Sequence, residues 1–229
     1  MRIGLIGVAG AGKDTSAKIL SDLTGKPVVL FAKPLHDTAI HIWGAKALNR
    51  EEKEKEQIFG ERSFEWFNDY HMALLAKINS TQNVITERNL HKLLTLRDLF
   101  TDPATGRIYE TITPRKFMQL YGTEYWRSIL PSVWVNLVQD KYDDCIVPDV
   151  RFANEAMIFD LLIVIKRDGV IPVSSHISEE LANQFKDLCE QKEPIKHWFG
   201  GIAKDLIVLE NNGTIGSLEH KLKEIVEGL

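Results

Sequence analysis

The chain has 229 residues, of which 44% are hydrophobic and 26% charged, with a formal net charge of −4. These values are ordinary for a globular protein and suit one α/β domain with an elaboration. The negative charge argues against tight binding to a nucleic-acid polymer, which needs a basic surface. The two cysteines lack metal-ligand spacing, and no signal pattern or long apolar run is present. We therefore expect a cytoplasmic protein that does not bind a membrane. The sequence is compatible with a monomer or a homodimer.

A glycine-rich turn follows the first predicted strand. Residues 2–8 are a short apolar run, the sequence GVAGAGKDT spans 7–15, and 13–23 is typical of a helix. Glycines leave backbone N–H groups free to point at phosphate oxygens, and the helix directs its positive dipole end at the same oxygens. Lys13 adds a charge for the β- and γ-phosphates. The pattern predicts a triphosphate-binding loop, with a turn that binds no ligand as the alternative. Its binding residues would be Gly10, Ala11, Gly12, Lys13, Asp14 and Thr15.

Position 14 departs from the usual phosphate-loop pattern, in which a serine or threonine follows the lysine. Asp14 stands there, and Thr15 comes one place later. A carboxylate holds Mg²⁺ directly or through a water molecule, because hard cations prefer oxygen ligands. We therefore expect ATP and Mg²⁺ as cofactors, with Asp14 contacting the metal and Thr15 facing the α-phosphate.

The next apolar run, residues 28–32, is predicted to be a second buried strand. Pro34 then opens a helix that runs to about residue 47. Two buried strands joined by a helical crossover predict a parallel sheet.

From residue 49 to residue 113 the pattern changes. Residues 51–56 are a charge run typical of a solvated helix face or a loose loop, and residues 64–78 have amphipathic helical spacing. Residues 107–110 resemble one strand of a hairpin, because a turn precedes them. We interpret 49–113 as an insertion and predict that it forms a flap over the acceptor site.

Helices and buried strands alternate again after residue 113. Thr113 and Pro114 begin a helix as cap and first-turn residue, and this helix is expected to end near Gly122. Three more strands are expected at 145–148, 161–165 and 206–209, with a closing helix to residue 228. The fold class is therefore α/β, with a doubly wound five-stranded parallel sheet in a single domain over residues 1–229.

Ligands of such sheets bind at the carboxyl ends of the strands, so polar residues there are candidates for a site. They are Lys33, Asp149, Arg151, Asn154, Glu155, Lys166, Arg167, Asn211 and Asn212. A phosphoryl group in transfer spreads negative charge over its oxygens, and one placed arginine is worth about 10³–10⁵ in rate. We therefore expect Lys13, Arg151 and Arg167 to be catalytic, with helix caps and surface ion pairs as the alternative. The sequence does not decide whether Asp149 binds the acceptor or Mg²⁺.

Arg167 also begins a polar segment, residues 167–205, with glycines at 169 and at 200–201 that could act as hinges. We predict that this segment is a lid. A lid expels water, so that the acceptor rather than water takes the phosphate.

Several short strings occur in a fixed order over nearly the whole chain. They are Gly-Lys-Asp-Thr at 12–15, Met-Gln-Leu-Tyr-Gly-Thr at 118–123, Trp-Val at 134–135, Val-Pro-Asp-Val-Arg at 147–151 with Glu155, His-Ile-Ser-Glu at 176–179 and Asn-Gly-Thr at 212–214. Their order and spacing resemble the deoxynucleoside monophosphate kinases of bacteriophages, which are P-loop kinases. The resemblance leaves out residues 49–113. It implies that the γ-phosphate of ATP is transferred to a deoxynucleoside 5′-monophosphate.

The resemblance also implies roles for single residues. Arg115 would bind the acceptor, and Trp134 would lie against its deoxyribose or base, although a core position is an equal alternative for this tryptophan. Asn211 and Gly213 would belong to a loop beside the adenine of ATP. The substrate-binding set is then Lys33, Arg115, Trp134, Asp149, Arg151 and Glu155.

Two other classes of protein remain open. One is a P-loop kinase of another small phosphorylated acceptor, of the dephospho-coenzyme A or phosphomevalonate type. The other is a switch that hydrolyses its triphosphate, which would not need an acceptor.

Overall fold

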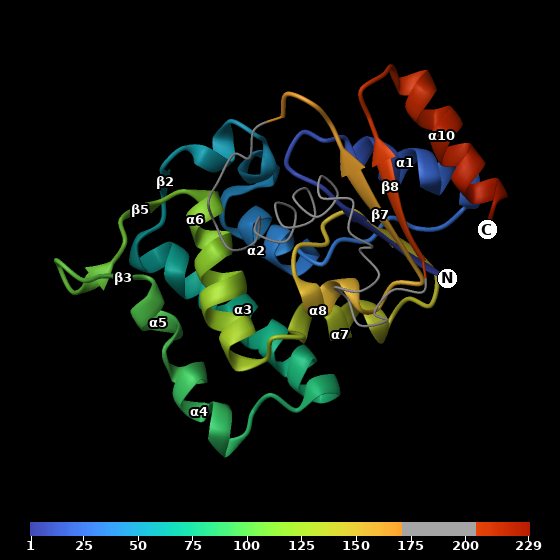
Figure 1. The fold of residues 1–229 in the computed structure, drawn as a ribbon. Coiled ribbons are helices and arrows are strands. Elements are labelled where there is room, and N and C mark those ends of the chain that lie inside the picture. The colour runs from blue at the N-terminus through green and yellow to red at the C-terminus, as the bar shows by residue number, and fades with distance from the viewer. Residues whose placement is uncertain (171–204) are drawn as a thin grey trace. The chain divides into compact units, whose positions relative to one another are not determined.

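The computed structural model describes residues 1–170 and 205–229. The chain divides into two compact units, each considered by itself below. Unit 1 comprises Met1–Phe31 and Val138–Leu229, and unit 2 comprises Ala32–Leu137. Figure 1 shows the elements of both. No helix within 1–170 or 205–229 is long and apolar enough to cross a membrane.

Unit 1 contains a four-stranded parallel sheet in the order β6-β1-β7-β8. Its strands are β1 (Arg2–Ile6), β6 (Cys145–Val147), β7 (Leu161–Lys166) and β8 (Asp205–Glu210). In the register, Ile3 of β1 lies opposite both Ile146 and Leu161. Residues 161–165 are buried throughout, as expected for a strand covered on both faces. The predicted α/β class is confirmed, and the three later predicted strands form where the apolar runs placed them.

The predicted strand over 28–32 did not form, so among the described residues the sheet has four strands rather than the expected five. Val28 makes an isolated parallel bridge to Ile146 and remains 43% exposed. Pro27 has no N–H with which to extend the ladder toward the N-terminus, and the chain turns at Phe31. The segment therefore contributes one isolated bridge beside β6, at the edge of the sheet, and not a strand.

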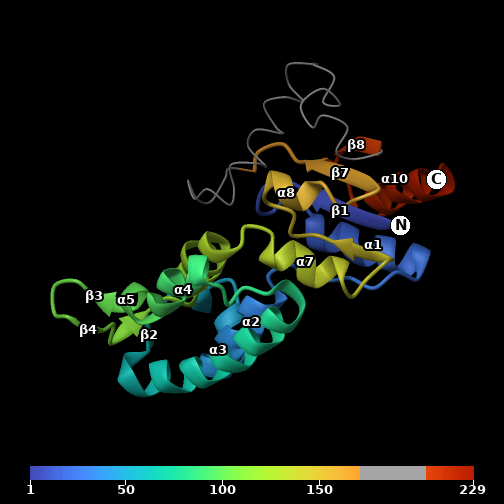
Figure 2. The ribbon, with the colours of Figure 1, turned by 90° about the horizontal axis from the view of Figure 1, so that it is seen from below.

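The described helices of unit 1 are α1 (Lys13–Thr24), α8 (Ala153–Ala156) and α10 (Ile215–Glu227), together with the end of α7 (Val133–Gln139). The boundary between the units falls within α7. Helices α1 and α10 lie side by side in both views (Figures 1 and 2). Leu20 of α1 and Leu222 of α10 are fully buried. Thr214 caps α10 by accepting a hydrogen bond from the N–H of Ser217.

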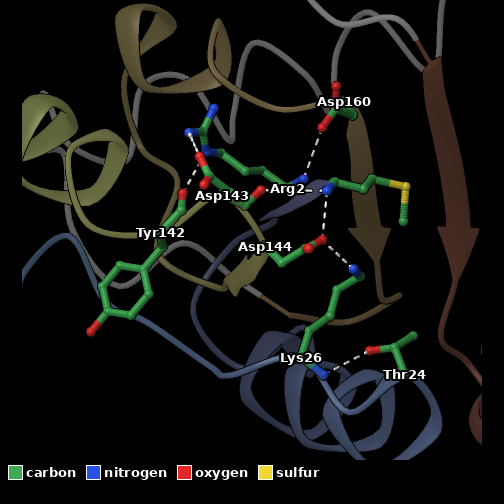
Figure 3. A network of polar contacts seen from close by, with 8 residues as sticks. Arg2, Thr24, Lys26, Tyr142, Asp143, Asp144 and Asp160 are labelled. Carbon is green, nitrogen blue, oxygen red and sulfur yellow. Dashed lines mark hydrogen bonds and ion pairs between the residues drawn. The ribbon is translucent and has the colours of Figure 1, made fainter.

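A polar network joins the amino ends of β1 and β6 to the end of α1 (Figure 3). Lys26 Nζ bonds to Asp144 Oδ1, and this contact lowers the pKa of the Asp144 carboxyl to about 2. The Arg2 N–H donates to Asp160 Oδ2 at 2.9 Å, and Arg2 Nε donates to the Tyr142 carbonyl at 2.8 Å. This network lies at the end of β1 away from the glycine-rich loop and holds strands together.

Unit 2 is built from helices and short strand pairs rather than from a large sheet. Its elements are α2 (Lys33–Trp43), η1 (Ala45–Leu48), η2 (Glu52–Glu54), β2 (Gln57–Ile58), α3 (Gly60–Gln82), α4 (Glu87–Leu94), α5 (Leu96–Leu99), β3 (Thr101–Asp102), β4 (Arg107–Ile108), β5 (Thr111–Ile112), α6 (Pro114–Gln119) and the π-helix η3 (Leu120–Arg127). The predicted helix over 64–78 lies inside α3. The predicted hairpin is present as the antiparallel pair β3–β4. The segment 49–113 falls wholly in unit 2, and its role as a flap stays a prediction.

The helix predicted from Thr113 and Pro114 begins as expected but does not end near Gly122. Thr113 Oγ1 accepts a hydrogen bond from the N–H of Lys116 at 3.1 Å. The helix then continues as η3. A Cβ at Gly122 would lie 2.5 Å from Leu35 Cδ1 of α2. Glycine at this position thus permits close helix packing rather than ending the helix.

Aromatic rings form the core of unit 2. The Phe67 ring of α3 is fully buried, and its centroid lies 4.8 Å from that of Tyr121 and 5.0 Å from that of Phe117, both edge-on. His71 is buried one turn further along α3, and burial lowers its pKa to about 4. Its Nδ1 lies 3.0 Å from the Tyr121 hydroxyl.

Candidate nucleotide-binding site

The predicted loop occupies the space between the end of β1 and the start of α1. Its first turn is closed by a hydrogen bond of 3.1 Å from the Ala11 N–H to the Val8 carbonyl. Gly10 and Gly12 have φ angles of +86° and +104°, in the left-handed region that favours glycine. The 12-residue helix α1 starts directly afterwards at Lys13, so its positive end faces the loop. This is the geometry of an anion-binding loop.

Two glycines allow the loop to lie against the carboxyl ends of β7 and β8. A Cβ at Gly7 would lie 2.6 Å from the carbonyl oxygen of Ile165, which is backbone that cannot easily move. A Cβ at Gly12 would lie 2.4 Å from Asn211 Nδ2. Side chains at these positions would therefore displace the loop from the sheet.

The Lys13 side chain folds back onto its own loop. Its Nζ donates hydrogen bonds to the carbonyl oxygens of Gly7 and, at 3.0 Å, of Val8. These two hydrogen bonds hold the positively charged ammonium group inside the turn. Phosphate oxygens are stronger acceptors than carbonyl oxygens, so they can compete for this ammonium group.

The first turn of α1 offers an oxygen ligand for a cation. Asp14 and Thr15 are both exposed there. In the part of the chain that the structure describes, no group of three or more histidine, cysteine or acidic side chains gathers to hold a metal ion. One carboxylate beside a phosphate loop fits Mg²⁺, which takes one or two carboxylates and completes its shell with substrate phosphates and water.

The turn after β6 is held by two carboxylates. Asp149 Oδ1 accepts a hydrogen bond of 3.0 Å from the N–H of Phe31. Glu155 is only 1% exposed, and its Oε2 accepts from the N–H groups of Arg151 at 2.6 Å and Phe152 at 3.0 Å. The side chain of Arg151 is exposed. Glu155 therefore fixes the backbone from which the Arg151 guanidinium projects.

The ends of β7 and β8 carry the remaining candidates of unit 1. Arg167 is exposed at the end of β7. The next residue, Asp168, is clasped by Asn212, whose Oδ1 accepts from the Asp168 N–H at 2.9 Å and whose Nδ2 donates to Asp168 Oδ2 at 2.7 Å. Gly213 is exposed in the same turn, and Asn211 is buried. Apart from residues 167–170 and 205, the predicted lid lies outside the described residues.

Three predicted acceptor-binding residues belong to unit 2. Lys33 Nζ pairs with Asp37 at 2.8 Å, and Arg115 Nε pairs with Glu54 Oε1 at 2.5 Å. Trp134 is 2% exposed, and its Nε1 lies 3.3 Å from the Gly122 carbonyl, to which it donates. This burial gives the tryptophan a packing role, so a contact with a nucleotide stays a prediction.

Two features of the site were missed from the sequence. The charge run over 51–56 contains Glu54, which reaches Arg115 in a helix 61 residues further along. Asn211 binds the carbonyl of Ala11 in the loop. The available signal for Asn211 was a polar residue directly after a buried strand, but that signal does not say which group the side chain meets.

The loop, the helix that follows it and the parallel sheet define a phosphate-loop α/β protein. No family model matches the sequence. The deoxynucleoside-5′-monophosphate kinase of Escherichia phage T5 is 30% identical over an alignment of 176 residues, and the match covers 67% of this chain and 69% of that protein. The chain therefore belongs to the deoxynucleoside-5′-monophosphate kinase family.

Among solved structures, dephospho-CoA kinase from Campylobacter jejuni aligns over 99% of this chain and 96% of its own. The TM-score is 0.38 and the sequence identity 14%, a likeness too distant to carry an argument.

Proposed function

We propose that this chain transfers the γ-phosphate of ATP to the 5′-phosphate of a deoxynucleoside monophosphate, giving ADP and the diphosphate. The observation that carries the proposal is the loop before α1. Its left-handed glycines and the Lys13 ammonium suit a polyphosphate, in a chain of the deoxynucleoside-5′-monophosphate kinase family.

The donor would bind to the loop from Gly10 to Thr15. The Lys13 ammonium exchanges the carbonyls of Gly7 and Val8 for β- and γ-phosphate oxygens. Asp14 would hold Mg²⁺, which neutralises phosphate charge when it is bound. The N-terminal end of α1 adds a favourable field for the same oxygens.

The reaction needs positioning and charge neutralisation more than covalent catalysis by the protein. An oxygen of the acceptor's 5′-phosphate attacks the γ-phosphorus, and the bond from that phosphorus to the β–γ bridging oxygen breaks, so ADP leaves with the electron pair. We assign Arg151 and Arg167 as the cations that meet the growing charge. Both guanidinium groups sit on exposed strand ends of unit 1. One correctly placed arginine is worth about 10³–10⁵ in rate.

The acceptor would be recognised by Arg151 through its phosphate and by Asp149 through a sugar hydroxyl or base edge. Glu155 supports this group by holding the backbone at Arg151. Lys33, Arg115 and Trp134 of unit 2 remain proposals for the same role. Lys33 and Arg115 would then exchange their present carboxylate partners for phosphate.

A coupled assay of ADP release tests the proposal across the four deoxy- and four ribonucleoside monophosphates. Dephospho-coenzyme A, phosphomevalonate and a reaction without acceptor are the comparison arms. At least one deoxynucleoside monophosphate should raise ADP release well above the rate without acceptor. A response only to dephospho-coenzyme A or phosphomevalonate would reassign the acceptor, and full activity without any acceptor would indicate a hydrolase.

A further inference from the structure

Asn211 is a buried polar residue at the carboxyl end of β8. Its backbone N–H donates to the Lys166 carbonyl at 2.7 Å, which extends the pairing of β7 and β8 by one residue. The residue is 7% exposed, and its Nδ2 donates to the carbonyl oxygen of Ala11 at 2.8 Å. The side chain thus joins the sheet to the phosphate loop, 200 positions away in sequence.

This hydrogen bond fixes the orientation of one peptide group in the loop. The peptide between Ala11 and Gly12 is trans, and a planar trans peptide directs its C=O and its N–H to opposite sides. Because the Ala11 carbonyl is turned toward Asn211, the Gly12 N–H is directed away from it. A flip of this peptide would present a carbonyl oxygen, which repels phosphate, where a donor is needed.

The approach of Asn211 to the loop depends on glycine at position 12. The Cβ that any other residue would carry there lies 2.4 Å from Asn211 Nδ2, and Gly12 also has a φ of +104°. The absence of a side chain at position 12 therefore leaves the space in which the Asn211 carboxamide reaches the loop. Asn212 makes a different contact, since its carboxamide is exposed and binds Asp168 instead of the loop.

We propose that Asn211 is a positioning residue for the triphosphate: its carboxamide orients the Ala11–Gly12 peptide so that the Gly12 N–H serves as a phosphate donor. This inference rests on the proposed function. It replaces a contact between Asn211 and the adenine base by a contact with the loop backbone. Asn211 thus acts on every ligand that carries the polyphosphate, whatever base is attached.

The test uses inorganic triphosphate, which has no base, beside Mg-ATP. Binding of both probes is measured by calorimetry on the wild-type chain and on Asn211→Asp and Asn211→Ala. The aspartate variant keeps the shape of the side chain but replaces the donor by a negatively charged acceptor, whereas the alanine variant removes the donor without adding charge. Loss of a buried hydrogen bond that leaves a carbonyl unpaired predicts that both probes bind roughly tenfold more weakly, by the same factor. The Michaelis constant for ATP should rise while that for the deoxynucleotide stays unchanged.

Weaker binding of ATP with unchanged binding of triphosphate would overturn the inference, because it would indicate a contact with the base. Wild-type binding of both probes by the two variants would also overturn it, while leaving the proposed function intact. Binding of neither probe by the wild-type chain would overturn the proposed function as well.

Asn136→Ala is the matched control. The Asn136 Nδ2 donates to Gln82 Oε1 at 3.1 Å in unit 2, and removing this side chain should leave the affinities for triphosphate and Mg-ATP unchanged.

Should neither Asn211 variant fold, nuclear magnetic resonance of the ¹⁵N-labelled wild-type chain tests the inference instead. Adding triphosphate should shift the Gly12 amide and the Asn211 side-chain amide together. A shift of Gly12 with an unmoved Asn211 side chain would contradict the inference.

Discussion

In unit 1, the buried polar side chains of Asn211 and Glu155 bind backbone groups of the loops that carry the candidate catalytic residues. In unit 2, the buried polar side chain of His71 instead binds the hydroxyl groups of Tyr121 and Tyr125 inside an aromatic core. Both arrangements satisfy buried polar atoms. We propose that the first orients groups that meet ligands, whereas the second stabilises packing. Substitutions in unit 1 should therefore change activity more than stability, and those in the core of unit 2 the reverse.

Lys13→Ala should have the largest effect on activity. Removing the ammonium from the phosphate loop should lower the rate of transfer by about 10³-fold, or about 4 kcal/mol of transition-state stabilisation. The melting temperature should change little, because the Nζ hydrogen bonds described above go to carbonyls of its own loop. Lys18→Ala, an exposed lysine of the same helix, is the control. A Lys13→Ala rate above a tenth of the wild-type rate would contradict the assignment of the loop.

Phe67→Ala should show the opposite behaviour. Truncating a fully buried ring that contacts Tyr121 and Phe117 should reduce the free energy of unfolding by about 3–5 kcal/mol. Trp66→Ala, at the exposed neighbouring position of α3, should cost less than about 1 kcal/mol. Urea denaturation measures both. Equal losses for the two variants would show that this aromatic core does not stabilise the chain as described.

The buried His71 should make stability fall in acid. Its pKa is about 4 in the folded chain and 6.5 when it is exposed, so between these values the unfolded state binds more protons. The free energy of unfolding should fall by about 3 kcal/mol on this account as the pH drops from 6.5 to 4. Unfolding of the wild-type chain and of His71→Gln should be compared at both ends of this range.

In His71→Gln this part of the pH dependence should be absent, whereas His220→Gln, at an exposed position of α10, should retain it. An identical pH dependence in the wild-type chain and His71→Gln would show that His71 does not cause the loss of stability in acid.

The tautomer of the His71 ring can be inferred from its contacts. The Tyr125 hydroxyl donates to the Leu93 carbonyl, so it accepts from Nε2, and Nδ1 accepts from Tyr121.

Arg151→Ala should change acceptor binding in particular. Loss of the exposed guanidinium should raise the Michaelis constant of the deoxynucleoside monophosphate by roughly 10- to 100-fold, as expected for a charge-assisted contact. It should also lower kcat, because Arg151 is proposed to meet the charge that grows on the transferred group. The constant for ATP should stay near that of the wild type. Lys223→Ala, an exposed cation of α10, provides the control in steady-state kinetics. An equal increase for both substrates would move Arg151 away from the acceptor.

Asp144→Asn should have the smallest effect. The carboxylate is exposed although Lys26 bonds to it, and exposed ion pairs contribute little. We expect a small fall in melting temperature that added salt diminishes, with unchanged activity. A large loss of transfer activity would show that this end of the sheet influences the loop.

The sequence predicted those parts of the fold that depend on local spacing. The phosphate loop, the buried strands and the Thr113 cap each follow from a few adjacent residues. The strand over 28–32 was predicted wrongly because an apolar run does not reveal whether a partner lies beside it. Gly122 was interpreted as a helix end for a similar reason: its close contact with Leu35 depends on packing between distant segments.

The candidate site could be predicted as a set of residues but not as a set of roles. Polar residues at strand ends identified Asn211 and Glu155, yet the sequence did not show that both bind backbone groups. The pairing of Arg115 with Glu54 joins residues far apart in the chain, and no local pattern indicates it.

The central claim is that the outermost phosphate of ATP moves to a second nucleotide rather than to water. Phosphorus nuclear magnetic resonance of the wild-type chain with Mg-ATP and deoxynucleoside monophosphates follows that phosphate directly. The account predicts that ADP and a deoxynucleoside diphosphate appear in equal amounts, with little inorganic phosphate. Release of inorganic phosphate in step with ADP, while every monophosphate remains unchanged, would contradict it.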